Sequence, residues 1–469
     1  MRTFLIGYLF ILPQLLIAQP NTELKKKLDA LVTEAVSKNV FSGNILVVND
    51  HNVLFESVTG KADIANRIEN TATTSFNIGS ITKMFTGIIT YQLAAEGKLG
   101  LSATVGKYLQ GFAPEIADHV TIQQLIDHTS GLGDYSQQEG FMQTHQNIRL
   151  VADILPLIQK SPLLFTPGEG KQYSNSGYVV LSAIIEKIAG KDYATVVKER
   201  IFTPLGMDHS GFNAYAKAEK GKAIGYLSNQ LGSLQNNLSM HVVGAGDGGI
   251  YSTTGDMMKF MQSFLYDNRL LSNENKLRCI NTPLFPVTYA SWEDFSQRGR
   301  LALAGGAPGI SAVIALNREK NYSIIVLSNF DEGTAEQMNQ RISAVLNNRT
   351  PAPFQIPPAK FIYALLKEKG AQYFLLNYQK DLQEAHISMD DDMNLLYAGK
   401  QLLEDKNADA AIALYTIYTK EFPNIVVAWN DMGDAYLLKG DKEKAKPCFQ
   451  QALKLRPGNE RARKALERL

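Results

Sequence analysis

Short runs of β-branched and aromatic residues lie at both ends of the region from residue 23 to about 347. Two such runs within residues 44–58 are separated by the polar segment 50–52, and two within residues 309–328 are separated by the polar segment 317–321. Each arrangement predicts a β-hairpin. Between the two ends, apolar residues recur at helical spacing. We therefore expect an α+β fold, in which an antiparallel sheet built from both ends of the region packs against helices.

The C-terminal part of the chain carries an internal repeat with a period of 34 residues. The matching pairs are Leu395 and Trp429, Gly399 and Gly433, Ala411 and Ala445, Tyr415 and Phe449, and Pro423 and Pro457. This pattern resembles the tetratricopeptide repeat, in which small residues let two helices pack closely and proline ends the second helix. An unrelated pair of helical hairpins is the alternative. The repeats predict a helical module that binds a protein partner.

Two segments connect the α+β region to the repeats. Four prolines within residues 350–360 predict a linker, because proline lacks a backbone donor and stiffens the chain. The apolar helical stretch 361–376 is expected to form a degenerate first repeat, to cap the array or to dock on the preceding domain. Two repeats are fewer than the roughly three that usually stabilise such an array.

The first twenty residues differ from the rest of the chain. Arg2 precedes an apolar run from Thr3 to Ala18, and the sequence turns polar at Gln19. This pattern predicts an export signal over residues 1–19, and therefore a periplasmic or secreted protein without a membrane span after signal removal. Leu16 stands where a small residue is usual, so the cleavage site stays open. An uncleaved membrane anchor is the alternative, although it usually needs about 20 cleaner apolar residues.

Composition narrows the function classes. Forty-seven basic and 46 acidic side chains leave a net charge of +1, which gives no whole-chain attraction for nucleic acid. The seven histidines are scattered, and we expect neither a metal site nor a cofactor. Cys279 and Cys448 are expected to be ordinary buried side chains. The predicted organisation is a signal peptide (1–19), a catalytic domain (23–347), a linker with a connecting helix (348–389) and helical repeats (390–469).

Ser80 and Lys83 form the central chemical motif. Apolar residues recur after Ser80 at helical spacing, at Ile81, Met84, Phe85, Ile88, Ile89 and Leu93. Ser80 is therefore expected to open a helix, with Lys83 one turn later on the same face. A serine hydroxyl is a weak nucleophile until a neighbouring base takes its proton, and a helix N-terminus favours a developing oxyanion. The Ser-x-x-Lys spacing alone is weak, because chance matches on surface helices are common.

A second motif, Tyr173-Ser-Asn175, follows about ninety residues later and precedes a predicted helix. Tyr173 is a candidate proton carrier, since an adjacent lysine ammonium favours a phenolate. Asn175 is a candidate to hold Lys83 or the substrate carbonyl through its amide. The alternative is a capped loop, because Ser and Asn suit such turns.

Together, Ser-x-x-Lys and Tyr-x-Asn resemble the class C β-lactamase, DD-peptidase and family VIII esterase group over residues 25 to 345. The flanking segments 120–132, 204–207 and 246–256 agree with that group. The resemblance implies a β-lactamase/transpeptidase-like fold and a serine hydrolase acting on a small-molecule or peptide substrate. Ser80 would be the nucleophile, Lys83 and Tyr173 the proton carriers, and Asn175 a binding residue. The amide of Gly306 would form the oxyanion hole with that of Ser80.

The third motif of that group departs from the pattern at residues 303–309. Gly305, Gly306, Pro308 and Gly309 resemble the group, but Leu303 takes the position of a lysine or histidine that helps to place a substrate carboxylate. We therefore expect an esterase or peptidase rather than a true β-lactamase. A nearby arginine, such as Arg298 or Arg300, is the alternative source of the missing charge.

Three further polar residues invite functional interpretations. His128 is expected to be a hydrogen-bonded turn residue rather than a member of a Ser-His triad. Asp247 and Asp256 lie near glycine-rich turns, and we expect both carboxylates to cap backbone amides.

The alternative to an enzyme is a poorly catalytic or non-catalytic binding protein, which recognises a ligand with the hydrolase fold and recruits a partner with the repeats.

Overall fold

The computed structural model describes residues 19–138, 141, 145–212, 219–240, 243–282, 287–331, 333–388 and 391–469. The predicted signal segment 1–18 lies outside these residues, and Gln19 is the first residue of helix α1. The chain divides into two compact units. The first comprises Met1–Leu227 and Asn236–Pro353, and the second comprises Ser228–Gln235 and Phe354–Leu469.

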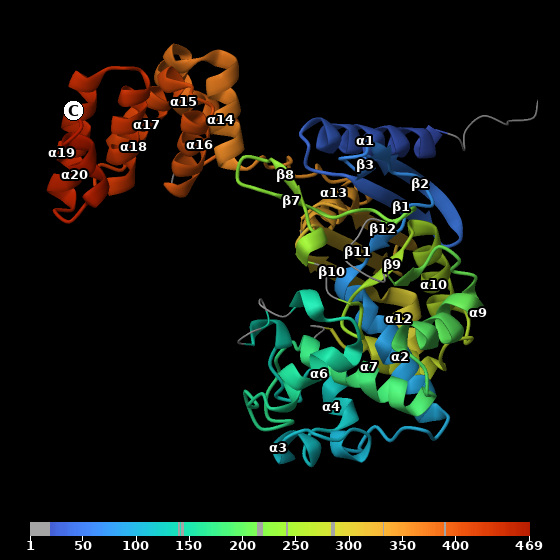
Figure 1. Cartoon of the computed structure of the whole chain (residues 1–469). Helices are drawn as coiled ribbons and strands as arrows, with labels where there is room; N and C mark the ends of the chain where they lie inside the picture. The colour runs from blue at the N-terminus through green and yellow to red at the C-terminus, as the bar shows by residue number, and fades with distance from the viewer. Residues whose placement is uncertain are drawn as a thin grey trace, which may run out of the picture. The chain divides into compact units, whose positions relative to one another are not determined.

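A five-stranded antiparallel sheet of order β10-β11-β12-β1-β2 organises the first unit (Figure 1). Both predicted hairpins, β1–β2 and β11–β12, are confirmed, and β1 pairs with β12 from Gly43↔Ser328 to Asn49↔Tyr322. The two ends of the region thus close one sheet, as the sequence predicts. The strands are β1 (Gly43–Asn49), β2 (Asn52–Thr59), β10 (Arg300–Ala307), β11 (Ile310–Asn317) and β12 (Tyr322–Ser328).

The central strands β1, β11 and β12 are buried on both faces of the sheet: successive side chains of a strand point to opposite sides, and most of them are buried. In β1, Leu46 and Val48 join the large core of the unit, whereas Ile45 and Val47 are buried on the other face. Helices α1 (Gln19–Ser37) and α13 (Thr334–Leu346) pack against each other and against the sheet, and Figure 1 shows them on the side away from the main helical region.

The main helical region carries α2 (Thr82–Ala95) in its interior. Ten of the fourteen residues of α2 are buried, and the helix packs against α7, α8 and α11. A 3-10 turn, η1 (Gly79–Ile81), leads into α2 and contacts β10 and β11. The other helices are α3 (Pro114–Ala117), α4 (Ile122–Ile126), α6 (Val151–Gln159), α7 (Asn175–Ala189), α8 (Tyr193–Val197), α9 (Thr203–Leu205), α10 (Thr254–Tyr266), α11 (Asn273–Ile280) and α12 (Trp292–Arg298).

Short strands complete the first unit. The strand β9 lies between β5 and β6, β3 pairs with β4, and β7 pairs with β8. The segment Ser228–Gln235 within the β7–β8 hairpin belongs to the second unit by its contacts. Bounds are β3 (Lys61–Asp63), β4 (Ile68–Glu69), β5 (Phe76–Asn77), β6 (Gly211–Phe212), β7 (Tyr226–Ser228), β8 (Leu234–Asn236) and β9 (Ile250–Ser252).

The second unit is a helical array whose repeat rests on glycine–aromatic contacts. A Cβ on Gly399 would lie 2.5 Å from Tyr415 Cζ, and one on Gly433 would lie 2.6 Å from Phe449 Cζ. Glycine at both positions of the 34-residue period therefore lets each aromatic ring pack against the backbone of the preceding helix. The helices are α14 (Pro358–Lys369), α15 (Ala371–Glu384), α16 (Met393–Glu404), α17 (Ala408–Glu421), α18 (Val426–Leu438), α19 (Lys442–Leu455) and α20 (Glu460–Leu466).

The stretch 361–376, predicted as one helical segment, is divided between α14 and α15. Gly370 ends α14 with φ 83° and ψ 167°, a conformation that side-chain-bearing residues rarely adopt. Helix α14 packs on α16 and α15 packs on α17. The two helices thus form part of the array. The fold class is confirmed as α+β followed by an α-helical module.

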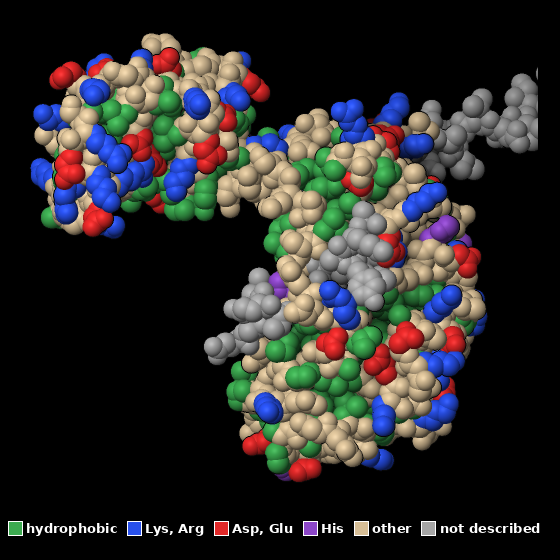
Figure 2. Space-filling model, viewed as in Figure 1, with side chains coloured by type: hydrophobic (Ala, Val, Ile, Leu, Met, Phe, Trp, Pro, Cys, Tyr) green, Lys and Arg blue, Asp and Glu red, His purple; other side chains and the backbone are tan. Residues whose placement is uncertain are grey.

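The described residues show four further features of surface and composition. Basic and acidic side chains are interspersed over the visible face of the second unit (Figure 2). Within the described residues, no helix has the length and apolar character needed to cross a membrane, and no cluster of three or more His, Cys, Asp or Glu is placed to hold a metal ion. Cys279 and Cys448 are buried free thiols, as expected.

Candidate active site

Ser80 is carried by a tight turn that lies directly against strand β10. Gly79 adopts φ 50°, and its amide donates to Asn77 Oδ1 at 2.9 Å. A Cβ on Gly79 would lie 2.9 Å from the amide nitrogen of Gly306, and a Cβ on Gly305 would lie 2.9 Å from the amide nitrogen of Ser80. Glycine at 79 and 305 therefore permits the backbone approach that brings the Ser80 and Gly306 amides together.

Lys83 lies in the first turn of α2 with 6% of its surface exposed. Its Nζ donates to Ser80 Oγ at 3.2 Å, to Asn175 Oδ1 at 2.7 Å and to the carbonyl oxygen of Asp247 at 2.7 Å. Three acceptors match the three N–H groups of an ammonium. The side chain is thus held at a fixed position beside the serine hydroxyl.

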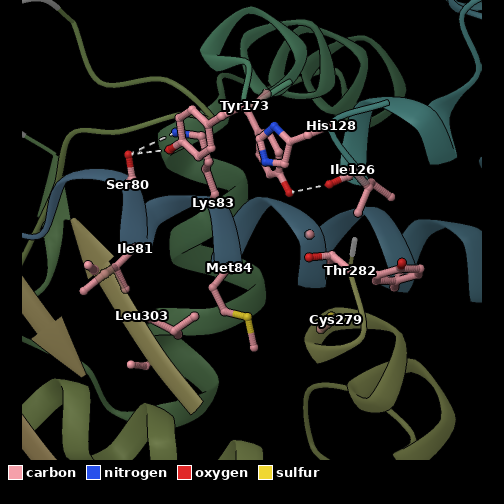
Figure 3. Close-up of a pocket in the computed structure, with 15 residues that line it drawn as sticks. Ser80, Ile81, Lys83, Met84, Ile126, His128, Tyr173, Cys279, Thr282 and Leu303 are labelled. Carbon is pink, nitrogen blue, oxygen red and sulfur yellow. Dashed lines mark hydrogen bonds between the residues drawn. The ribbon is translucent and has the colours of Figure 1, made fainter. Parts of the chain in front are cut away.

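Tyr173 approaches the same hydroxyl from the loop that precedes α7. Its phenolic oxygen donates to Ser80 Oγ at 2.8 Å, and Lys83 Nζ lies 4.8 Å from the centre of its ring. Figure 3 shows Tyr173 and Lys83 converging on Ser80. Ser80 Oγ therefore has two candidate proton carriers within hydrogen-bond distance.

Asn175 is the first residue of α7 and connects Lys83 to an acidic side chain. Its Oδ1 accepts from Lys83, and its Nδ2 donates to Asp134 Oδ2 at 2.5 Å. Ser174 caps α7 by accepting from the Gly177 amide at 3.1 Å, which fixes where the helix begins. Both ends of the Asn175 amide are therefore used, and its orientation is set by its neighbours.

Asp247 contributes its backbone carbonyl to the site, a contact that was not predicted from the sequence. Its backbone carbonyl binds Lys83, and its buried carboxylate accepts from the Tyr135 hydroxyl at 3.0 Å. Burial raises the pKa of Asp247, and the positive charge of Lys83 opposes that rise. Asp256 instead fits the expectation, because its carboxylate accepts from the His209 amide at 2.9 Å.

Asp134, Tyr135 and the carbonyl of Asp247 were not predicted from the sequence. The glycines at 248 and 249 marked a tight turn there, but turn chemistry does not say which distant side chain the turn contacts.

His128 packs against Tyr173 and hydrogen-bonds to the backbone beside it. It adopts φ 58°, and its Nδ1 accepts from the Ser174 amide at 3.0 Å. Its ring stacks on Tyr173 with 4.7 Å between centroids and on Tyr178 with 5.0 Å. Burial, with a smaller effect of the Lys83 charge, lowers the pKa of His128 to about 3. The ring is therefore neutral at ordinary pH.

Leu303 lies on β10 beside Met84 and lines a cavity of about 170 Å³ next to Ser80 (Figure 3). The two arginines considered as substitutes for the missing cation lie elsewhere. Arg298 pairs with Asp294, and Arg300 pairs with Glu319 at 2.7 Å. Neither arginine lines this cavity.

Comparison with known proteins shows the family to which this chain belongs. Residues 28–347 match the protein family described as beta-lactamase. The chain belongs to the beta-lactamase family. It is a serine hydrolase of that family, and residues 426–459 match the tetratricopeptide repeat.

Individual relatives and solved structures are similar to this chain over the same region. Penicillin-binding protein 4* of Bacillus subtilis (strain 168) is 29% identical over 333 residues, which cover 66% of this chain and 73% of that protein. The penicillin binding protein structure from Bacillus halodurans is 28% identical, with a TM-score of 0.59 over 68% of this chain and 98% of that one. An octameric penicillin-binding protein homologue from Pyrococcus abyssi shares the fold, with 24% identity and a TM-score of 0.60 over 73% and 81% of the two chains.

Within this beta-lactamase-family domain, the predicted site residues lie together. Ser80, Lys83, Tyr173 and Asn175 are joined by hydrogen bonds, and Gly306 reaches the site through the backbone contact of β10 with the Ser80 turn. Four segments far apart in the sequence, the Ser80 turn with α2, the α7 start, the Asp247 turn and β10, thus build one site.

Proposed function

We propose that this serine hydrolase acts by forming an acyl-enzyme at Ser80 Oγ. The observation that carries the proposal is the position of Tyr173 Oη at 2.8 Å and Lys83 Nζ at 3.2 Å from that oxygen. A serine hydroxyl needs a neighbouring group to take its proton, and a positive charge beside an oxygen favours the anionic form of that oxygen.

The reaction then has two stages, formation of the Ser80 ester and its hydrolysis by water. Tyr173 acts from its phenolate form, which the charge of Lys83 favours, and takes the proton of Ser80 as Oγ bonds to the substrate carbonyl carbon. The amides of Ser80 and Gly306 bind the oxyanion, and the N-terminus of α2 adds favourable dipoles. Tyr173 returns the proton to the leaving oxygen or nitrogen as its bond to carbon breaks. Water then attacks the Ser80 ester by the same proton path and releases the acid.

Esters, amides or peptides are the proposed substrates, and esterase or peptidase activity is favoured over β-lactam hydrolysis. Leu303 offers neither a charge nor a hydrogen-bond donor to a substrate carboxylate. An anionic substrate would have to lose water there without gaining a partner, which is unfavourable.

Labelling with a tagged fluorophosphonate, read by intact mass, tests the nucleophile. The wild-type chain should gain one label, and Ser80→Ala should gain none. Ser161→Ala is the matched control, because Ser161 lies outside the site and its hydroxyl donates to the Leu157 carbonyl at 2.6 Å. Unchanged labelling of Ser80→Ala would overturn the proposal. Labelling without turnover of any ester or amide would favour the binding-protein alternative, to which the tetratricopeptide repeat contributes a partner-binding surface.

Export is the second part of the proposal, with a periplasmic or secreted mature chain. It is supported by Arg2 and the apolar run from Thr3 to Ala18, followed by the helix that begins at Gln19. N-terminal sequencing of the protein recovered outside the cytoplasm should show that this run has been removed. An intact Met1 on that protein would contradict signal cleavage.

A further inference from the structure

Ser80 lies between two cavities with different linings. The first, of about 170 Å³, is lined mainly by apolar side chains, among them Ile81, Met84 and Leu303. The second, of about 320 Å³, contains polar groups that include Asn175, Asp247 and the backbone of Gly306. Because Ser80 lines both, a substrate bound at its Oγ can extend one part into each cavity.

The first cavity is suited to a neutral apolar group. Figure 3 shows it running from Ser80 past Met84 and Leu303 to Cys279 and Thr282. Among the described residues that line it, Lys83 is the only Asp, Glu, Lys or Arg, and its three N–H groups already have acceptors. Burial raises the pKa of the Cys279 thiol, which therefore stays neutral. The cavity has roughly ten times the ~10–15 Å³ that one water needs, so it holds a group of several carbon atoms.

Gly87 explains why this space is free. It is a buried residue in the interior of α2 and lines the cavity, and a Cβ built on it would meet no atom within 4 Å. Two other glycines near the site have no such room: a Cβ on Gly246 would lie 2.3 Å from the Tyr178 carbonyl, and one on Gly305 would lie 2.0 Å from the Ile78 carbonyl. Glycine destabilises a helix interior relative to alanine. At position 87 no steric clash requires glycine, but the absence of a side chain leaves the cavity open.

We propose that Gly87 keeps open an apolar subsite for the leaving group of the substrate, so that the preferred substrates are esters or amides of neutral, apolar alcohols or amines. The inference rests on the proposed function. Tyr173, which returns a proton to the leaving group, lines the apolar cavity, whereas Gly306 and Asn175 line the polar one. The leaving oxygen or nitrogen therefore faces the apolar cavity, and the acyl part extends towards the polar cavity.

Two isomeric esters test this assignment, because hexyl acetate and ethyl hexanoate have the same composition but carry the long chain on opposite sides of the scissile bond. Gly87→Leu should lower kcat/KM for hexyl acetate by about tenfold or more, since filling a hydrophobic pocket discriminates at that level. Values for ethyl hexanoate and ethyl acetate should stay within about twofold of wild type. Ala95→Leu, which adds the same side chain at an exposed position of α2, is the matched control. Gly87→Ala should show a smaller effect and a higher Tm, because alanine favours the helix.

A binding experiment separates this inference from the proposed nucleophile. 1-Hexanol should raise the Tm of the wild-type chain and of Ser80→Ala relative to Gly87→Leu, because occupancy of the cavity does not require Ser80. The same response to 1-hexanol in all three chains would overturn the subsite. A loss confined to ethyl hexanoate would instead assign the cavity to the acyl group. If Ser80 resists labelling while 1-hexanol distinguishes the variants, the proposed reaction fails and the apolar site remains.

Discussion

The phenolic oxygen of Tyr173 lies 2.8 Å from Ser80 Oγ, although the two residues are 93 positions apart in the chain. Lys83 Nζ contacts the same oxygen and lies 4.8 Å from the Tyr173 ring centre. One proton path therefore uses both side chains. Lys83→Ala and Tyr173→Phe should each lower kcat by about 100- to 10,000-fold, and the double variant should be little worse than the poorer single variant. Fully multiplicative losses in ester hydrolysis would show that the two side chains act independently.

Leu303→His is expected to improve anionic substrates selectively. The imidazole would supply a donor or a charge beside Ser80, where Leu303 now lines an apolar cavity and neither Arg298 nor Arg300 reaches. A hydrogen bond to a charged group is worth about 1.5–3 kcal/mol, which corresponds to roughly one to two orders of magnitude in kcat/KM. Comparing one neutral ester with one cephalosporin in both chains measures the change. A wild-type chain that already prefers the cephalosporin would contradict this role of Leu303.

The neutral His128 ring should make the hydrolase domain less stable as the pH falls below about 6.5. The folded-state pKa of about 3 lies below the ordinary value of 6.5, so between these values the unfolded chain binds a proton that the folded chain does not. The free energy of unfolding should therefore fall with decreasing pH in this window, by up to about 1.4 kcal/mol per pH unit from this residue.

His128→Asn is the matched variant for that measurement. Asparagine tolerates the φ of 58° and offers an oxygen to the Ser174 amide, but it does not titrate in this range. Urea unfolding between pH 4.5 and 7 should show a shallower pH dependence for the variant. Equal slopes in the two chains would mean that other groups cause the acid sensitivity.

A chain ending at Pro353 should keep the fold and the probe reactivity of the hydrolase unit, because the contacts divide the molecule there. The buried Arg341 guanidinium donates to the carbonyls of Ala352 and Pro353 at 2.9 and 2.6 Å. A chain ending at Asn348 lacks both acceptors and should be less stable by at least about 1–3 kcal/mol. Thermal unfolding and fluorophosphonate labelling compare the two. An insoluble or inert chain ending at Pro353 would show that the hydrolase unit depends on the helices.

The sequence pattern correctly predicted features that depend on residues close together in the chain. The β-branched and aromatic runs within 44–58 and 309–328 form the two hairpins as predicted, and the 34-residue period places Gly399 and Gly433 against aromatic rings. The spacing of three also brings Lys83 to Ser80, because a helical turn fixes that distance. These outcomes follow from the backbone geometry of one or two adjacent elements.

Contacts between segments far apart in the chain could not be predicted from the sequence pattern. The carbonyl of Asp247 meets Lys83 only because the turn after residue 243 packs on α2, and no local pattern encodes that contact. The sequence does not show the empty space beside Gly87, because residues of the distant elements α11 and β10 help to enclose it. The division of residues 361–376 at Gly370 was a missed local signal, because glycine commonly ends a helix.

The pairing of Gly43 with Ser328 has a consequence for the newly synthesised chain. Strand β1 is made early, but its partner β12 leaves the ribosome almost three hundred residues later. Until then, the β1–β2 hairpin has an unpaired apolar edge, which is prone to pair with other chains. The helical array, whose contacts are mostly local, has no comparable delay after its own synthesis. The order of the strands therefore exposes this edge to pairing with other chains for most of the time that the hydrolase unit is being synthesised.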